Sequence, residues 1–197
     1  MRKLIVANIV SLDGYSSGPG DNVMVMPMGG PFDSHNLERM LAADTILLGR
    51  RSYEMFLGFW PSVADDPTAT PDNRGISLAY RPLQKVVVSD TLTMAQTGVW
   101  RDTTRIIRRA DAYKEIEALK QQEGKDILMF GSRTLWNDLL AHGLVDELHL
   151  MIGAVVLGEG MSAFIGQPPV SLTLMGVPRT WAGSNNYVVR YAVGPKI

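Results

Sequence analysis

Short apolar runs rich in β-branched residues alternate along this chain with longer segments whose apolar residues recur at helical spacing. This alternation predicts strands at 4–12, 45–48, 85–89, 104–108 and 126–130. It predicts helices starting at Asp33 or Ser34, running from Arg50 to a stop at 58–61, and spanning 111–123 and 134–142. Strands separated by helices run parallel in one sheet, so we expect an α/β fold with helices on both faces.

The carboxyl-terminal third has a different pattern. Residues 146–152 alternate as a strand, and two further strands are predicted at 171–177 and 187–193, separated by the turn signal of 183–186. These last two strands read as an antiparallel hairpin at the edge of the sheet. Residues 15–32 and 62–82 are rich in Gly, Pro and small polar residues and are predicted as long loops. We expect residues 1–197 to form a single domain.

Composition excludes several classes of protein. Nineteen basic and 20 acidic residues give a net charge of -1, which provides no field for binding nucleic acid. The chain has no cysteine, and its three histidines lack metal-ligand spacing, so we predict no metal site. No apolar run reaches the roughly 18 residues of a membrane span. We therefore expect a cytoplasmic protein with no membrane partner.

The common signatures of nucleophilic and phosphate-loop enzymes are also missing. The sequence contains no G-x-S-x-G, no G-x-x-x-x-G-K-[ST], no G-x-G-x-x-G after the first strand, and no H-E-x-x-H. An enzyme without a nucleophile signature is typical of cofactor chemistry, because the cofactor supplies the reactive group.

Two segments combine a strand end, a glycine, hydroxyl or guanidinium groups and a helix start. The first contains Gly49, Arg50, Arg51 and Ser52, and the second contains Gly131, Ser132, Arg133 and Thr134. Helix amino termini attract anions through their N–H groups and dipole. The alternative is that each glycine only turns the chain and the arginines are solvated. Together at the carboxyl edge of a parallel sheet, the two segments favour a dinucleotide and its pyrophosphate.

Two more strand ends add donors to this edge. Ser89 follows one strand, and Arg108 and Arg109 end the next. Arginine matches a phosphate monoester with two parallel hydrogen bonds, so these residues favour NADPH over NADH. Taken one by one, these residues are better explained as a turn and a solvated strand end, and it is their joint occurrence that favours the phosphate site.

The order and spacing of these segments resemble the dihydrofolate reductase-like fold over almost the whole chain. Within that fold, the chain is similar to single-domain reductases related to the carboxyl-terminal half of the riboflavin-biosynthesis deaminase-reductase. The segments that carry the resemblance are IVANIVSLDGY at 5–15, LLGRRSYE at 47–54, FWP at 59–61, KVVVS at 85–89, FGS at 130–132, LVDEL at 144–148 and VVLGEG at 155–160.

The resemblance implies an NADPH-dependent reductase that acts on a small heterocycle. It implies that the 2′-phosphate is held by Arg50, Arg51 and Ser89, with help from Arg108 or Arg109. It implies that the pyrophosphate is bound by Gly131 and Ser132, with Arg133, Thr134 and Leu135 beside them. Ala7 and Asn8 would then lie by the nicotinamide. Asp13 is either a turn residue beside the cofactor or only a turn residue. A homodimer formed through the sheet and the carboxyl-terminal strands is expected by the same analogy.

The substrate side depends on Asp33. Dihydrofolate reductases use one acidic residue of the first helix to bind and protonate the pteridine, and the resemblance makes Asp33 the candidate catalytic acid; the alternative is a helix amino-terminal cap. The leading hypothesis is hydride transfer to an aminopyrimidine of the riboflavin-biosynthesis type. Dihydrofolate reduction and a nucleotide-binding protein without turnover are the alternatives.

Overall fold

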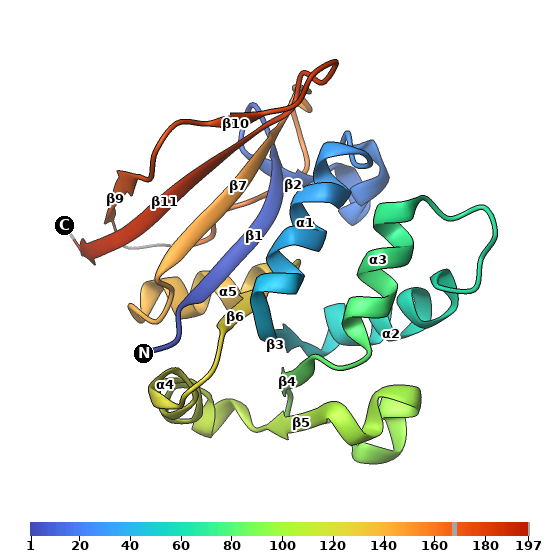
Figure 1. Cartoon of the computed structure of the whole chain (residues 1–197). Helices are drawn as coiled ribbons and strands as arrows, with labels where there is room; N and C mark the ends of the chain where they lie inside the picture. The colour runs from blue at the N-terminus through green and yellow to red at the C-terminus, as the bar shows by residue number, and fades with distance from the viewer. Residues whose placement is uncertain (167–168, 197) are drawn as a thin grey trace.

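A computed structural model describes residues 1–166 and 169–196, and six parallel strands form the centre of its sheet (Figure 1). Their order across the sheet is β7-β1-β6-β3-β4-β5. Their bounds are Leu4–Ser11 for β1, Ala43–Gly49 for β3, Gln84–Val88 for β4, Thr104–Ile107 for β5, Asp126–Met129 for β6 and Glu147–Gly153 for β7. Because these strands are parallel, all of their carboxyl ends lie at one edge.

Antiparallel strands extend the sheet beyond β7. Strand β11 (Tyr187–Lys196) pairs antiparallel with β7, and both β9 (Val170–Leu174) and β10 (Arg179–Thr180) pair antiparallel with β11. The predicted antiparallel end of the sheet is thus confirmed, although β10 lies in the segment between the two predicted strands. Two short strands, β2 (Tyr15–Ser17) and β8 (Met161–Ser162), form a separate pair.

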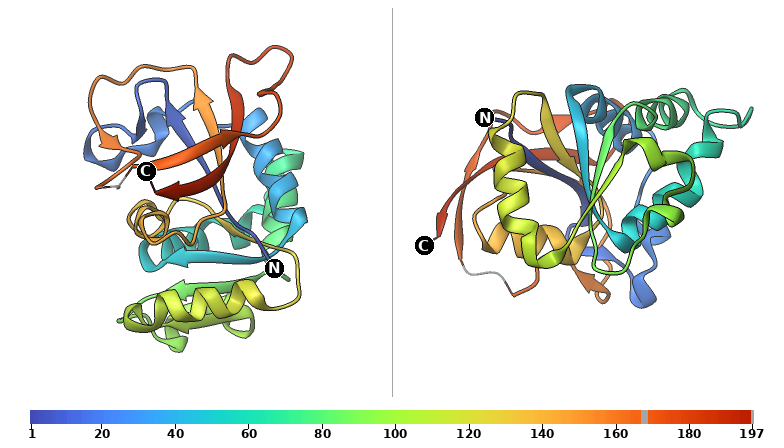
Figure 2. Two further views of the ribbon diagram at one scale, coloured as in Figure 1. Left: turned by 90° about the vertical axis from the view of Figure 1, so that its left-hand side faces the viewer. Right: turned by 90° about the horizontal axis from the view of Figure 1, so that it is seen from below.

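Helices cover both faces of the sheet, as predicted (Figure 2). Helices α1 (Pro31–Ala42), α2 (Arg50–Val63) and α3 (Pro71–Tyr80) pack over one apolar cluster, and α4 (Ala112–Gln121) and α5 (Arg133–Ala141) pack over the other. Short 3-10 segments occur at Pro19–Asp21, Val23–Val25, Met94–Thr103 and Arg109–Asp111. The central strand β1 is buried along its whole length except at Asn8, which is only half-buried.

Two helix predictions were wrong at one end. Helix α1 begins at Pro31 with Gly30 as its cap, so Asp33 lies in the first turn and does not cap the helix. Helix α2 continues through Pro61 to Val63. In its last turn, the Trp60 carbonyl accepts a hydrogen bond from the Ser77 hydroxyl over 2.6 Å.

The predicted loop at 62–82 contains helix α3. Thr70 caps this helix by accepting a hydrogen bond from the Asn73 N–H, and Pro71 occupies its first position. Proline is well tolerated there because the first helical N–H has no intrahelical partner. The same residues that suggest a loop therefore also start a helix.

Within the described ranges, no helix is long and apolar enough to cross a membrane. The same ranges contain no group of three or more His, Asp or Glu side chains that is arranged to hold a metal ion.

Candidate cofactor site

Five of the predicted site residues meet where the carboxyl ends of β1, β3 and β6 lie side by side. The Asn8 side chain accepts a hydrogen bond from the Gly131 N–H over 2.7 Å and donates to the Gly131 carbonyl over 3.4 Å. The Ser52 hydroxyl accepts from the Ser132 N–H over 2.9 Å, and the Ser132 hydroxyl accepts from the Gly49 N–H over 3.1 Å. These contacts hold the amino termini of α2 and α5 together, and we call these five residues the cradle.

Two residues of the cradle have a backbone conformation with positive φ, which favours glycine. Gly131 has a φ of +54°, and Ser132 follows it in the left-handed conformation with a φ of +50°. A Cβ atom on Gly131 would lie 3.2 Å from the Ser52 hydroxyl oxygen. The glycine therefore lets the two helix ends approach closely.

The cradle has the donors that a dinucleotide pyrophosphate requires. The Ser52 and Ser132 hydroxyl oxygens accept hydrogen bonds from backbone N–H groups, so their own O–H protons are available to donate to an anion. The amino termini of two helices, of 14 and 9 residues, add their dipoles at the same place.

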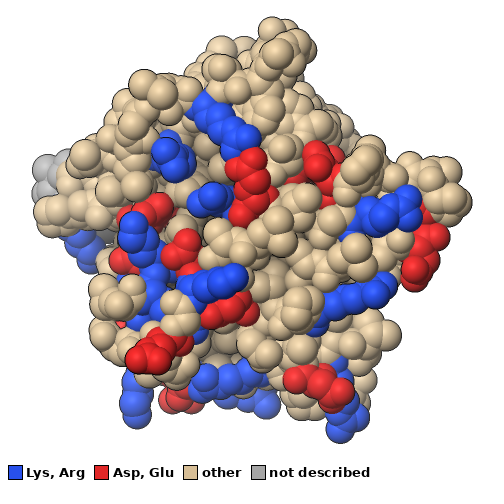
Figure 3. Space-filling model, in the orientation of Figure 1, with Lys and Arg blue, Asp and Glu red and all other residues tan. Residues whose placement is uncertain are grey.

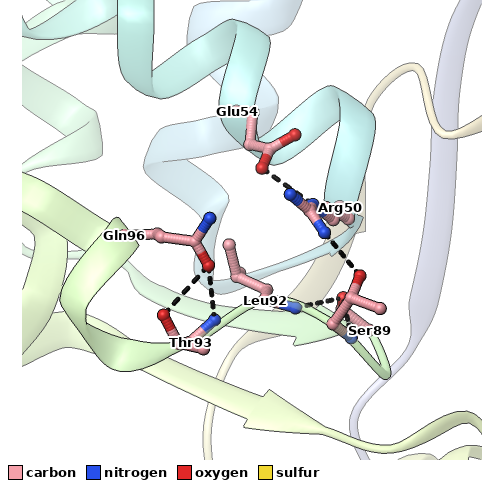
Figure 4. A network of polar contacts seen from close by, with 7 residues as sticks. Arg50, Glu54, Ser89, Leu92, Thr93 and Gln96 are labelled. Atoms are coloured by element: carbon pink, nitrogen blue, oxygen red, sulfur yellow. Dashed lines mark hydrogen bonds and ion pairs between the residues drawn. The ribbon is translucent and has the colours of Figure 1, made fainter.

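A second group of predicted residues lies beside the cradle, at the ends of β4 and β5 (Figure 4). The Arg50 guanidinium donates to the Thr91 hydroxyl and to the Glu54 carboxylate. Ser89 is buried, and its hydroxyl accepts from the N–H groups of Thr91 and Leu92 over 3.2 and 2.9 Å. The turn from Ser89 to Leu92 is therefore rigid, and Arg50 joins it to the start of α2.

Arg108 and Arg109 have different positions in this group. Arg108 donates to the Ser89 carbonyl over 3.1 Å, so it lies against the turn. Arg109 forms an exposed ion pair with Asp90 at 3.3 Å. Arg50, Ser89 and Arg108 thus form one cluster, which we call the rim cluster, with Arg109 at its solvent side.

The other predicted cofactor residues are arranged less closely. The Arg51 side chain is 88% exposed and pairs with Asp21 in the loop after β2, so it points away from Arg50. Arg133 donates to the Ser162 carbonyl over 2.7 Å, and Thr134 is exposed on α5. Ala7 is buried in the core, where its side chain packs with α1, α2 and α3. Leu135 is partly buried against the apolar cluster under α4 and α5.

Asp13 does more than turn the chain after β1, because its side chain connects two segments of the structure. Its carboxylate accepts hydrogen bonds from the Ser11 hydroxyl and from the N–H groups of Leu157 and Gly158. The Ser11 hydroxyl and these backbone donors lower the pKa of Asp13 from 3.8 to about 2. The ionised side chain therefore joins the end of β1 to the loop that follows β7.

Asp33 faces helix α3. Burial and the neighbouring Asp72 carboxylate raise the pKa of Asp33, and a hydrogen bond with Asn73 opposes this shift. Helices α1 and α3 lie side by side on the same face of the sheet (Figure 1). The carboxyl group is therefore half-buried between two helices and holds a proton more readily than an exposed aspartate.

Sequence reasoning missed the acidic partners of the arginines. Glu54 lies four residues after Arg50, a spacing that indicates an ion pair on one helix face. Asp21 lies in the segment after β2 and Arg51 in the first turn of α2, and no local pattern relates the two.

Comparison with known proteins shows the family of the chain. The family model described as the RibD C-terminal domain matches residues 2–189. The chain belongs to the RibD C-terminal domain family. A relative, the uncharacterized protein YyaP of Bacillus subtilis (strain 168), is 32% identical over 168 residues. These residues are 83% of this chain and 81% of that protein.

Two solved structures share the fold of this chain. A pyrimidine reductase-like protein from Corynebacterium diphtheriae aligns with a TM-score of 0.61 at 16% identity, covering 99% of this chain and 93% of that one. Dihydrofolate reductase from Enterococcus faecalis, solved with NADP(H), aligns with a TM-score of 0.56 at 14% identity, covering 97% and 94%. The predicted dihydrofolate reductase-like fold is confirmed.

Proposed function

We propose that this chain is an NADPH-dependent reductase that transfers hydride to a C=N or C=O group of a small heterocycle. The observation that carries the proposal is the cradle, where separate loops from one sheet edge meet through direct hydrogen bonds. Membership of the RibD C-terminal domain family supports it. The substrate class that this family favours is the aminopyrimidine of riboflavin biosynthesis.

NADPH would supply the hydride, and the protein would hold and orient it. The cradle would bind the pyrophosphate through the Ser52 and Ser132 hydroxyls, and the rim cluster would bind the 2′-phosphate through Arg50 and Arg108. Asn8, inside β1, fixes the Gly131 peptide in place just after the end of β6, and the nicotinamide would lie beside it.

The direct test is NADPH oxidation by the purified protein, followed by absorbance with a panel of pyrimidines and pterins. The proposal predicts oxidation that depends on a pyrimidine. Oxidation with dihydrofolate alone would indicate dihydrofolate reductase activity. NADPH binding with no oxidation by any member of the panel would indicate a nucleotide-binding protein without turnover.

One arginine of helix α3 already has a structural role. Arg74 donates to the carbonyl groups of Ala64, Asp66 and Ala69 and so fixes the loop that precedes α3. These contacts use the guanidinium as a loop brace, which leaves it poorly placed to recognise a phosphoribosyl group. The panel should therefore include pyrimidines with and without the phosphoribosyl group.

Replacing Arg50 with glutamine is expected to weaken NADPH binding about tenfold and to leave NADH binding nearly unchanged. The guanidinium is held beside the Ser89 turn, and its bond to a 2′-phosphate would contribute about 1.4 kcal/mol. Dissociation constants for both coenzymes, measured by fluorescence titration, check this result.

Arg51→Gln is the matched control, because Arg51 is the next residue of the same helix but pairs with Asp21. We expect its NADPH affinity to change by no more than about twofold, as is usual for an exposed ion pair. An equal loss in the two variants, or no loss in Arg50→Gln, would remove Arg50 from the 2′-phosphate site.

Replacing Asp33 with asparagine is expected to lower turnover about 100-fold without changing NADPH affinity, because a general acid contributes on this scale. The raised pKa of Asp33 keeps its proton to a higher pH than an ordinary aspartate. Asp72→Asn removes a neighbouring negative charge, so it should lower that pKa and move the alkaline fall of kcat/KM to lower pH. Full turnover by Asp33→Asn would exclude Asp33 as the proton donor.

A further inference from the structure

A small basic cavity lies on the sheet face next to α1, between that helix and strands β10 and β11. It has a volume of about 130 Å³ and is lined by His35, Glu38, Arg39, Arg179, Val188 and Arg190. Basic side chains gather over this part of the surface (Figure 3). The cavity shares no residue with the cradle or the rim cluster.

The cavity contains more positive than negative charge. Arg179 is paired with Glu38 through two hydrogen bonds and also lies over the Trp181 ring, with 4.6 Å to its centroid. Within residues 1–166 and 169–196, no ion pair is formed by Arg39 or Arg190. Arg39 and Arg190 therefore line the cavity without an ion pair of their own, and the Glu38 carboxylate of the same lining is already paired with Arg179.

Buried donors without acceptors line the same cavity. His35 is only 5% exposed, and neither of its ring nitrogens has a hydrogen-bond partner among the described residues. The buried Arg39 Nε likewise has none there. Buried polar groups are almost always hydrogen-bonded, and an unsatisfied one destabilises the fold. The cavity lining thus includes ring and guanidinium nitrogens that have no hydrogen-bond partner among the described residues.

The imidazole at this site is neutral at physiological pH. Burial, the neighbouring His149 and the charge of Arg39 lower the pKa of His35 to about 4. The His149 ring lies 5.9 Å from that of His35, and its Nε2 is occupied by Glu147 over 2.8 Å. A neutral His35 ring offers one N–H donor to the cavity, and the guanidinium groups supply the charge.

We propose that this cavity binds a small oxyanion of the phosphate type, held by Arg39 and Arg190 with the His35 ring and Arg179 completing the site. A tetrahedral oxyanion offers several acceptors, which suit the fork of a guanidinium and leave one oxygen for the imidazole N–H. The anion can be free phosphate or the end of a phosphate ester. Binding would join α1 to the antiparallel strands β10 and β11.

The test uses the three histidines of the chain as separate reporters. Imidazole NMR signals of the full-length protein are followed while potassium phosphate replaces potassium chloride at constant ionic strength and pH. We expect the His35 signals to shift and saturate. The exposed His142, which contacts Asp138 and Tyr113, should not respond. An unchanged His35 signal would overturn the proposal.

Variants locate the bound anion. Arg190→Met and Arg39→Met should each weaken phosphate binding at least about tenfold, as expected when a charge-assisted hydrogen bond is lost. Arg101→Met, a substitution of an exposed arginine elsewhere, should leave it unchanged. Arg190 is exposed, so its replacement tests the site without removing core packing.

Two further experiments test whether the phosphate binds at the proposed coenzyme site instead and whether the ligand is free phosphate or a phosphate ester. Phosphate affinity should be the same in Arg50→Gln as in the wild type, and a loss in that variant alone would place the anion at the rim cluster and overturn the proposal. Glycerol 3-phosphate replaces inorganic phosphate in the second arm. Saturation by both ligands supports a site for phosphate esters, and saturation by inorganic phosphate alone supports a site for the free ion.

Discussion

Gly131→Ala is expected to weaken NADPH binding about 100-fold, which corresponds to roughly 2.8 kcal/mol. The new Cβ would lie 3.2 Å from the Ser52 hydroxyl oxygen, which holds the Ser132 N–H. Moving Ser52 would open the cradle. The φ of +54° at this residue adds backbone strain for any residue with a side chain. Calorimetric titration of NADPH measures the change.

Gly143→Ala provides the control for backbone strain alone. Gly143 has a φ of +71°, and a Cβ there would meet no atom within 4 Å. Both variants should lose a similar free energy of unfolding, on the order of 1 to 2 kcal/mol. Only Gly131→Ala should lose coenzyme affinity, and equal affinity in the two variants would contradict the position of the cradle.

Gly160→Ala is expected to lower the free energy of unfolding by about 3 kcal/mol or more. A Cβ at this residue would lie 2.2 Å from the Ser17 carbonyl oxygen and 3.0 Å from the Gly18 Cα, and both are backbone atoms. A contact of this kind cannot be relieved by rotating a side chain, so the β2–β8 pair must separate. Urea denaturation measures the loss.

Gly158→Ala lies two residues away in the same loop and separates strain from collision. Its φ is +73°, and a Cβ there would have open space around it. We expect a loss of on the order of 1 kcal/mol, from strain alone. If both variants were destabilised equally, the close approach of Gly160 to β2 would not explain the effect.

Most of the fold follows from local sequence patterns. The buried strands are short, apolar and bounded by turn residues, and each helix from α4 onward has a clear apolar face. Gly49 and Gly131 each follow a strand, and because these strands are parallel, both glycines lie at the same edge of the sheet. For this reason, the cradle could be predicted before its contacts were known.

Local sequence patterns do not predict the structure where the same residues are compatible with both a loop and a helix start. Thr70 and Pro71 fit both a loop and a helix start, so α3 was missed. Arg50 and Arg51 are adjacent in sequence, but the helix turns their side chains toward different loops, which sequence spacing alone does not reveal. The basic cavity is formed by α1, β10 and β11, which are far apart in the chain, so no motif indicates it.

The bond between Asn8 and Gly131 joins residues that are 123 positions apart. During synthesis, the Asn8 side chain of β1 can therefore bind the Gly131 peptide only after about two thirds of the chain has been made. Contacts of such long range form slowly, because the intervening chain must first be ordered. Truncated chains that end before Gly131 lack half of this contact, so the coenzyme binding that we propose for the cradle requires synthesis beyond that residue.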